Sequence, residues 1–298
     1  MSEGPEVKII ADRILCALQE KKIEQIICKN LDSHIKNKII GSELEYIKAF
    51  GKNLVFKFSS GIFLRNHMMM WGKWRFYERS KYDEGLALPP PRRSKKKYLN
   101  SSKTTRKEKD VRRDSRVRLT IITHDAVLIE FNGPILQFST DSPVDKEPIR
   151  LLGPDCLNDK IFNVEEIKHR LSSYSKRKEL LVSDALLNQN IIAGIGNKYK
   201  SEILFVCKIN PFNQISQLNL IQQNSLFGEI PKLLKYGYEN AGRTRQLLSG
   251  EPNSWNTRHY VFRRAGKECW ICKTKIKSEK KLTPRQTFWC PSCQKIKK

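Results

Sequence analysis

Four cysteines near the end of the chain have the type and spacing of a metal site. They form two CxxC pairs, Cys269 with Cys272 and Cys290 with Cys293, separated by a 17-residue stretch. Each pair can bring two thiolates to one metal, and a hairpin between the pairs completes a tetrahedral four-cysteine site. This spacing is typical of structural zinc, in which four protein ligands leave no position for water. We therefore expect one zinc ion that folds the segment and performs no chemistry.

A second candidate binding motif is the glycine turn from Gly194 to Asn197. It joins an apolar helical pattern to a second helical pattern over 199–205. Two glycines before a helix let backbone amides approach a phosphate, and a helix N-terminus favours an anion. A bend that needs glycine for helix packing explains the same residues equally well. The motif is not a dinucleotide-binding fingerprint, because no strand precedes it and the third glycine is missing.

The charge of the chain indicates a polyanionic partner. Lysine and arginine number 56 against 31 aspartate and glutamate, for a net charge of +25. Nucleic acid is the leading candidate. A membrane surface is the alternative, but the sequence has no run of about 18 apolar residues and no N-terminal signal segment. We expect an intracellular protein that acts on nucleic acid, in the nucleus or, in a source without one, in the cytoplasm, with no membrane partner.

Strands and helices must position these residues. The sequence patterns that predict strands and those that predict helices lie in different parts of the chain. Residues 22–78 and 117–140 are rich in β-branched and aromatic residues in short alternating runs, which predicts antiparallel strands. Residues 160–240 have a helical pattern. A helix over 5–20 precedes the strands, with Pro5 suited to its first position. The predicted fold class is α+β and multidomain, with an N-terminal helix and an antiparallel sheet or sandwich, a helical domain and a C-terminal zinc ribbon.

A basic insert over 79–116 interrupts the strands. From Arg92 to Arg116 there are 12 basic and 3 acidic residues and few apolar ones, so we expect disorder there. Subtracting its charge of +9 (12 minus 3) from +25 leaves +16, so the remainder is basic in its own right. The insert adds nonspecific phosphate contacts, directs the protein to a nucleus, or is a solvated linker.

Seven short motifs follow one another along the chain: Glu3-Gly4-Pro5-Glu6, Gly51-Lys52-Asn53-Leu54, His67-Met68-Met69-Met70-Trp71-Gly72, Leu152-Gly153-Pro154-Asp155, the turn Gly194 to Asn197, Val261 to Gly266, and the ribbon with Arg285, Thr287 and Phe288. In this order they resemble the formamidopyrimidine-DNA glycosylase and endonuclease VIII family of base-excision repair enzymes. The resemblance covers nearly everything outside 79–116. It implies a catalytic helix and β-sandwich domain over 1–150, a helix-two-turns-helix DNA-binding domain over 151–260 and a zinc ribbon over 261–298.

The resemblance implies covalent chemistry at the start of the chain. In this family Met1 is removed, and the new N-terminal amine, here that of Ser2, attacks C1′ of the damaged nucleotide. A Schiff base forms, the base leaves, and β- or β,δ-elimination follows. An α-amine with an ordinary pKa of about 7.7 to 8.0 is partly neutral near pH 7. Glu3 matches the catalytic acid, Glu6 is a helper, and Lys52 matches a basic residue that contacts phosphate.

Ser2 departs from the family, which usually has proline at this position. A primary amine still forms an imine that can be protonated, so the reaction remains possible. If Met1 is retained, the nucleophile is misplaced and Glu3 has nothing to assist. The structural alternative is that Gly4-Pro5-Glu6 is only a helix start.

The resemblance also implies how DNA is held. Met70 matches a methionine that fills the gap left by an extruded base, whereas Met68 and Met69 are expected in the core. The family's other void-filling residues are replaced by Phe131-Asn132-Gly133-Pro134. The substrate is therefore damaged DNA, either a duplex whose gap is filled otherwise or single-stranded and bubble DNA.

Phosphate contacts are implied on both sides of the helical domain. Asn197 matches a phosphate contact in the glycine turn, and Lys198 or Lys200 adds charge. Arg264 matches another contact near the ribbon. Arg285 lies on the hairpin between the cysteine pairs, where a guanidinium can grip phosphates in a bidentate manner.

The expected activity is that of a bifunctional DNA glycosylase and AP lyase, acting as a monomer. The short segment 244–260 and the Glu3-Gly4 start favour the endonuclease VIII branch and oxidised pyrimidines. One alternative is a noncatalytic damaged-DNA-binding protein. The other is a zinc-ribbon module that binds RNA or chromatin, which leaves the Glu3, Lys52 and Asn197 motifs unexplained.

Overall fold

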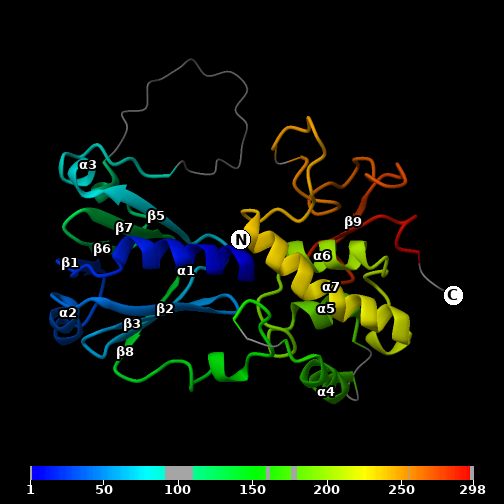
Figure 1. The fold of residues 1–298 in the computed structure, drawn as a ribbon, viewed down its shortest axis with the longest axis horizontal. Helices are drawn as coiled ribbons and strands as arrows, with labels where there is room; N and C mark the ends of the chain where they lie inside the picture. Colours follow the sequence, from blue (N-terminus) through cyan, green and yellow to red (C-terminus); the bar gives the residue numbers. More distant parts are fainter. Residues whose placement is uncertain (1, 91–109, 159–161, 176–179, 255, 296–298) are drawn as a thin grey trace. The chain divides into compact units, whose positions relative to one another are not determined.

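The computed structural model describes most of the chain, in two compact units (Figure 1). The described residues are 2–90, 110–158, 162–175, 180–254 and 256–295. The first unit consists of Asp12–Ile47 and the described part of Val55–Ser142, and the second unit of Ser2–Ala11, Lys48–Leu54 and the described part of Pro143–Lys298.

Helix α1 (Gly4–Leu18) forms where the sequence predicts it. Pro5 lies in its first turn, where a missing N–H costs nothing. Val7, Ile14 and Leu18 are fully buried, and their spacing gives the helix one apolar face. The predicted N-terminal helix is confirmed.

Two four-stranded antiparallel sheets follow, as the alternating pattern predicts. One sheet has the order β1-β6-β7-β5, with strands β1 (Gln25–Cys28), β6 (Val117–Ile122), β7 (Ala126–Phe131) and β5 (Lys73–Glu78). The other has the order β2-β3-β4-β8, with strands β2 (Leu44–Phe50), β3 (Asn53–Phe58), β4 (Phe63–His67) and β8 (Ile135–Ser139).

A short helix within the predicted strand region was not expected. Helix α2 (Ser33–Ile39) begins after Asp32, whose carboxylate accepts the backbone N–H groups of His34 (2.9 Å) and Ile35 (3.1 Å). This N-cap satisfies donors that the first turn of a helix otherwise leaves unpaired. A polar helix of this length lacks the apolar periodicity that would have distinguished it from a strand.

The ends of the predicted insert are ordered. Helix α3 (Arg79–Asp83) and a 3₁₀ turn, η1 (Val111–Arg113), flank it. Tyr82, Ala87 and Val111 are buried in one apolar cluster of the first unit. Because these side chains are buried, both ends of the insert expected over 79–116 belong to the folded unit. The centre of the insert, 91–109, lies outside the described residues.

Helices dominate the second unit. They are α4 (Val164–Ser175), α5 (Val182–Leu187), α6 (Asn197–Val206) and α7 (Leu220–Glu239), with 3₁₀ turns η2 (Ile149–Leu151) and η3 (Ile215–Gln217). Helix α7 runs beside α6 (Figure 1). A Cβ on Gly237 of α7 would lie 2.0 Å from the hydroxyl of Tyr199, so a glycine permits this close packing.

The ribbon is part of the same unit. Strands β9 (Lys277–Glu279) and β10 (Thr287–Trp289) pair in antiparallel register, with Phe288 opposite Ser278. Phe288 and Phe205 of α6 belong to one buried apolar cluster. This shared core explains why the segment expected as a separate domain over 261–298 clusters with the helices.

The division into units also differs from the expected boundary near 150. Ser2–Ala11 and Lys48–Leu54 cluster with the helical part of the chain. Gly4 donates its N–H to the carbonyl of Gly194 (2.8 Å), and Gly51 donates its N–H to the carboxylate of Asp155 (2.7 Å). These bonds fasten both motif-bearing segments to the second unit.

Candidate active site and metal centre

Glu3 lies at the N-terminus of α6. Its side chain is 1% exposed, and its carboxylate accepts the N–H groups of Gly196 (3.1 Å), Lys198 (2.9 Å) and Tyr199 (3.1 Å). The positive end of a helix favours a carboxylate at this point. The backbone N–H groups of the glycine turn, which were predicted to approach a phosphate, therefore donate to the carboxylate of Glu3 instead.

The glycine turn exists because Glu3 and Gly4 approach it closely. Gly194 has a φ of +86°, which favours glycine. A Cβ on Gly196 would lie 2.4 Å from the carboxyl carbon of Glu3. The two glycines thus allow the N-terminal segment to pack against the turn. This role differs from both interpretations of the sequence, phosphate binding and helix packing.

Glu6 and Lys198 form a partly buried ion pair beside Glu3. The Glu6 carboxylate accepts the backbone N–H of Glu3 (3.2 Å) and bonds the Lys198 ammonium, which also donates to the carbonyl of Gly242 (3.0 Å). Glu6 therefore orients the residue next to Ser2. DNA contact by Lys198 stays a prediction, and in this structure its ammonium is buried and engaged within the protein.

Lys52 is held beside this cluster by its neighbour Gly51, whose N–H bonds Asp155. Burial lowers the pKa of Lys52 to about 8, with the charge of Glu3 opposing the shift and that of Arg285 adding to it. Lys52 is half-buried and Arg285 is exposed. The structure thus brings Lys52 within electrostatic range of both Arg285 and the predicted acid, Glu3.

The hairpin that carries Arg285 is fixed by a buried lysine. Lys200 is fully buried, and its ammonium donates to the hydroxyl of Thr287 (2.8 Å). The hydroxyl of Thr287 in turn donates to the hydroxyl of Thr283 (2.9 Å), which donates to the carbonyl of Arg285 (2.6 Å). Burial also lowers the pKa of Lys200 to about 8. This network ties the backbone of the predicted phosphate-binding arginine to α6.

Asn197 contacts the same hairpin. Its side-chain amide donates to the carbonyl of Gln286 (2.8 Å), one residue after Arg285. Among the described residues, no group donates a hydrogen bond to its buried Oδ1. The first residue of α6 therefore positions the hairpin, and its predicted phosphate contact stays a prediction.

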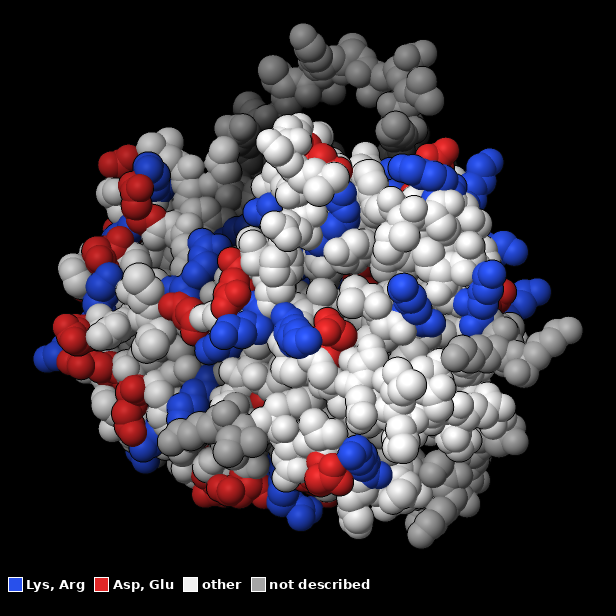
Figure 2. Space-filling model, turned by 45° about the vertical axis from the view of Figure 1, so that its right-hand side comes forward, with Lys and Arg blue, Asp and Glu red and all other residues white. Residues whose placement is uncertain are grey.

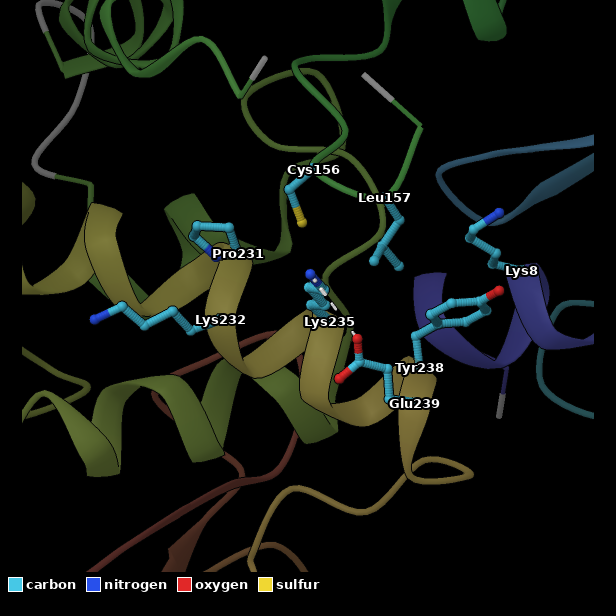
Figure 3. Close-up of a pocket in the computed structure, with 8 residues that line it drawn as sticks. All are labelled: Lys8, Cys156, Leu157, Pro231, Lys232, Lys235, Tyr238 and Glu239. Atoms are coloured by element: carbon cyan, nitrogen blue, oxygen red, sulfur yellow. Dashed lines mark ion pairs between the residues drawn. The ribbon is translucent and has the colours of Figure 1, made fainter. Parts of the chain in front are cut away.

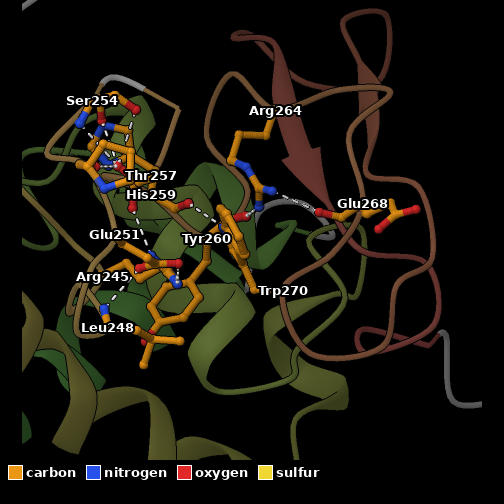
Figure 4. A network of polar contacts seen from close by, with 11 residues as sticks. Arg245, Leu248, Glu251, Ser254, Thr257, His259, Tyr260, Arg264, Glu268 and Trp270 are labelled. Carbon is orange, nitrogen blue, oxygen red and sulfur yellow. Dashed lines mark hydrogen bonds and ion pairs between the residues drawn. The ribbon is translucent and has the colours of Figure 1, made fainter.

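Arg264 is buried in a network around Trp270 (Figure 4). Its guanidinium donates to the carbonyls of Tyr260 and Glu268, the latter at 2.8 Å, and lies 4.2 Å from the centre of the Trp270 ring. Arg245 lies over the same ring at 4.1 Å. Arg264 thus stabilises the segment that leads into the ribbon, and its predicted contact with DNA stays a prediction.

Glu202 is a structural residue that the sequence analysis missed. Its fully buried carboxylate accepts the N–H groups of Tyr260 (2.7 Å), Val261 (2.8 Å) and Phe262 (2.8 Å), and the hydroxyl of Thr244. Burial raises its pKa, which these hydrogen bonds oppose. Glu202 therefore holds the segment that leads into the ribbon. Its backbone partners lie 58 to 60 positions later in the chain, so no local sequence pattern could predict them.

Met70 lies in the first unit, on the turn between β4 and β5, and is 44% exposed. Met68 is buried, as expected. Met69 is 47% exposed, so the expectation of a core role was wrong. Its φ is +49°, and its N–H donates to Nδ1 of His67 (3.0 Å).

The four predicted ligand cysteines converge. Their sulfur atoms all lie within 4.8 Å of one another, with Cys269 to Cys293 at 3.9 Å and Cys272 to Cys290 at 3.3 Å. Two of the four are buried and two are half-buried. Four converging thiolates fit a tetrahedral metal ion.

The surface carries many basic side chains. Figure 2 shows lysine and arginine distributed over the face drawn, with acidic residues among them. A pocket of about 380 Å³ in the second unit contains no predicted site residue (Figure 3). Its lining includes Lys235, which pairs with Glu239 (3.9 Å). In the described parts of the chain, no helix is long and apolar enough to cross a membrane.

Comparison with known proteins places these observations in a family. Residues 1–133 match the N-terminal domain of formamidopyrimidine-DNA glycosylase, and residues 152–248 match its H2TH domain. The formamidopyrimidine-DNA glycosylase of Aliivibrio fischeri strain ES114 is 30% identical over 59% of this chain and 67% of its own length. That of strain MJ11 is 31% identical over 57% and 66%. The chain thus spans about two thirds of these relatives.

Two further relatives align along nearly the whole chain. Endonuclease 8 of Escherichia coli strain UMN026 is 26% identical over 99% of this chain and 100% of its own length. The Lactococcus lactis enzyme Fpg, solved in complex with DNA that contains an abasic site, shares the fold with a TM-score of 0.75 and 22% identity, over 99% of this chain and 100% of that one. The chain belongs to the family of formamidopyrimidine-DNA glycosylase and endonuclease 8.

Proposed function

We propose that this protein is a DNA glycosylase with AP lyase activity that excises oxidised bases, preferably pyrimidines, in base-excision repair. The observation that carries the proposal is the burial of Glu3 next to Ser2, within electrostatic range of Lys52. An acid, an adjacent terminal amine and a cation for phosphate are the groups that this chemistry requires.

The reaction begins with the neutral amine of Ser2, which forms after removal of Met1. Its nitrogen bonds C1′ of the damaged nucleotide, and the glycosidic bond breaks as the base leaves with the electron pair and takes up a proton. Glu3 protonates the sugar ring oxygen, the C1′–O4′ bond opens, and a protonated imine remains. Loss of a C2′ proton then expels the 3′ phosphate, which is β-elimination. A second elimination can expel the 5′ phosphate.

The remaining residues hold the DNA. Lys52 and Arg285 are cations within electrostatic range of each other and suit the phosphates that flank the extruded nucleotide. Met70 is an exposed apolar wedge for the resulting gap. Zinc bound by the four cysteines would stabilise the hairpin of Arg285 and supply no reacting group.

Oxidised pyrimidines are proposed on the full-length similarity to endonuclease 8 and on the short segment 244–260. Excision rates measured on thymine glycol and on 8-oxoguanine opposite cytosine would test this preference. A faster rate on 8-oxoguanine would contradict it.

The proposed chemistry is tested by borohydride trapping. Protein whose mature N-terminus has been determined by mass spectrometry is incubated with an oligonucleotide that carries an abasic site or thymine glycol. Reduction should convert the Schiff base into a stable covalent adduct on the peptide that begins with Ser2. If protein with a processed Ser2 terminus binds the DNA but yields no adduct, the protein is a noncatalytic damage-binding protein instead.

A further inference from the structure

A tryptophan lies inside the predicted metal site. Trp270 stands between Cys269 and Cys272, so its backbone belongs to the turn that offers two thiolates. The ligand atoms are the two sulfurs, and metal binding does not itself require a tryptophan between them. The side chain is half-buried, and its indole N–H donates to the carbonyl of His259 (3.1 Å). The ring therefore contacts the segment that precedes the ribbon (Figure 4).

Two arginines lie over this ring. The guanidinium carbons of Arg245 and Arg264 lie 4.1 and 4.2 Å from its centre. Both side chains are buried, at 5% exposure each. Removal from water strengthens the attraction between a guanidinium and the face of an indole. Trp270 thus joins the segment that carries Arg245 to the metal-binding turn.

Arg245 in turn holds the loop 244–254, which follows helix α7. Its guanidinium donates two hydrogen bonds to the carboxylate of Glu251, both at 2.8 Å, and a third to the carbonyl of Thr257 (3.1 Å). The same carboxylate accepts the N–H of Leu248 (2.9 Å). Paired charge-assisted bonds fix the orientation of both groups. The loop is therefore folded around one arginine, and that arginine lies over the indole ring.

The loop begins beside the proposed active site. Lys198 donates to the carbonyl of Gly242 (3.0 Å), and a Cβ on Gly242 would lie 2.4 Å from the carboxylate of Glu6. Glu6 accepts the N–H of Glu3, the residue after Ser2. The start of the loop is therefore packed against the catalytic cluster, and its arginine ties the loop to the metal-binding turn.

We propose that Trp270 is a positioning residue for the loop 244–254, through which the metal-binding turn supports recognition of the damaged base. This inference rests on the proposed function, and the role is distinct from support of the Arg285 hairpin. The loop contacts the base before excision, whereas an abasic site offers it no base. Loosening of the loop therefore slows base removal and leaves incision at an abasic site unchanged.

The first measurement is hydrogen–deuterium exchange of peptides from 244–254 in zinc-loaded protein. The variants are Trp270→Leu, which keeps apolar bulk but loses the aromatic face and the indole N–H, and Trp270→Phe, which keeps an aromatic ring. Ile271→Ala is the matched control, because Ile271 lies between the same two cysteines and is 63% exposed. The zinc content of each protein is measured in parallel.

We expect exchange in the loop to be about tenfold faster in Trp270→Leu and within about threefold of the unsubstituted protein in Trp270→Phe, with exchange in α7 unchanged. Ile271→Ala should match the unsubstituted protein. Unchanged exchange in Trp270→Leu would overturn the proposal. Loss of zinc from Trp270→Leu would also overturn it, because Trp270 would then support the metal site and not the loop.

The second measurement compares two substrates under single-turnover conditions. Excision of thymine glycol by Trp270→Leu should be about tenfold slower than by Ile271→Ala, whereas incision of a preformed abasic site should be equal. Equal slowing on both substrates would overturn the proposal, because the defect would then not depend on the base. If the unsubstituted protein acts on neither substrate, the proposed function fails, and faster loop exchange in Trp270→Leu would still establish the positioning contact.

Discussion

The carboxylate of Glu3 accepts the backbone N–H of Lys198 at 2.9 Å, although the two residues lie 195 positions apart in the chain. One side chain therefore caps helix α6 and stands next to the proposed nucleophile. Helix α6 therefore fixes the position of the Glu3 carboxylate, and the hydrogen bonds to this carboxylate hold the N-terminal segment in place.

Glu3→Gln should abolish base removal while DNA binding stays within about threefold. The amide cannot donate the carboxylic proton, and loss of a general acid costs about 10² to 10⁴ in rate. Excision is measured under single-turnover conditions, and binding on DNA with an uncleavable abasic analogue. Glu20→Gln, at an exposed position after α1, is the control. Excision by Glu3→Gln at the rate of that control would contradict the assigned role.

Arg285→Ala should weaken DNA binding. The slope of the logarithm of the binding constant against the logarithm of the salt concentration should become shallower by the contribution of about one phosphate contact. Titrations at several salt concentrations give this slope. Lys280→Ala removes an exposed charge from the same hairpin and should change the affinity less. Equal effects of the two substitutions would show that Arg285 contributes only general charge.

DNA affinity should fall as the pH rises through about 8, because Lys52 loses its proton there. The ammonium is charged below this pKa and neutral above it, so phosphate attraction is lost on the alkaline side. In Lys52→Arg the guanidinium stays charged, and the decline should be smaller. The measurement is a binding titration at constant ionic strength from pH 6.5 to 9.5. Superimposable profiles for the two proteins would refute this role for Lys52.

Lys200 should make the free energy of unfolding rise with pH. Its pKa is about 8 in the folded protein and about 10.4 when unfolded. Between these values the unfolded state binds more protons, so stability increases with pH by at most about 1.4 kcal/mol per unit. Urea unfolding at pH 7 to 10 should show a flatter profile for Lys200→Met than for Lys235→Met, which removes an exposed lysine. Parallel profiles would contradict the prediction.

Metal removal should abolish DNA binding without unfolding the first unit. Thiolates that lose a shared cation no longer close the ribbon, and the hairpin of Arg285 then loses its support. A chelator titration followed by DNA binding, with metal content measured in parallel, checks this. Zn²⁺ should restore binding, whereas Mg²⁺, which prefers oxygen ligands, should not. Full binding by metal-free protein would exclude a structural role for the ion.

Local patterns predicted the elements whose residues carry their own periodicity. The spacing of Val7, Ile14 and Leu18 was sufficient for α1, and the runs of β-branched and aromatic residues in β3 and β6 were sufficient for the sheets. The cysteine spacing predicted a cluster because each CxxC turn fixes two ligands locally.

Long-range partners could not be predicted from the same patterns. Lys200 looks like a surface charge in the sequence, and only the packing of α6 on the ribbon buries it against Thr287, 87 positions later. Arg264 is adjacent to the exposed Arg263 in the sequence, yet it is buried over Trp270. Burial depends on which segments meet, and that information is distributed over the whole chain.

The hydrogen bond from Gly51 to Asp155 has a consequence for how such proteins can be divided or recombined. It joins a loop of the amino-terminal half to the carboxy-terminal half, as the bond from Gly4 to Gly194 also does. A fragment cut near residue 150 would lose the partners of both segments. Exchange of halves between homologues would therefore have to preserve both docking points.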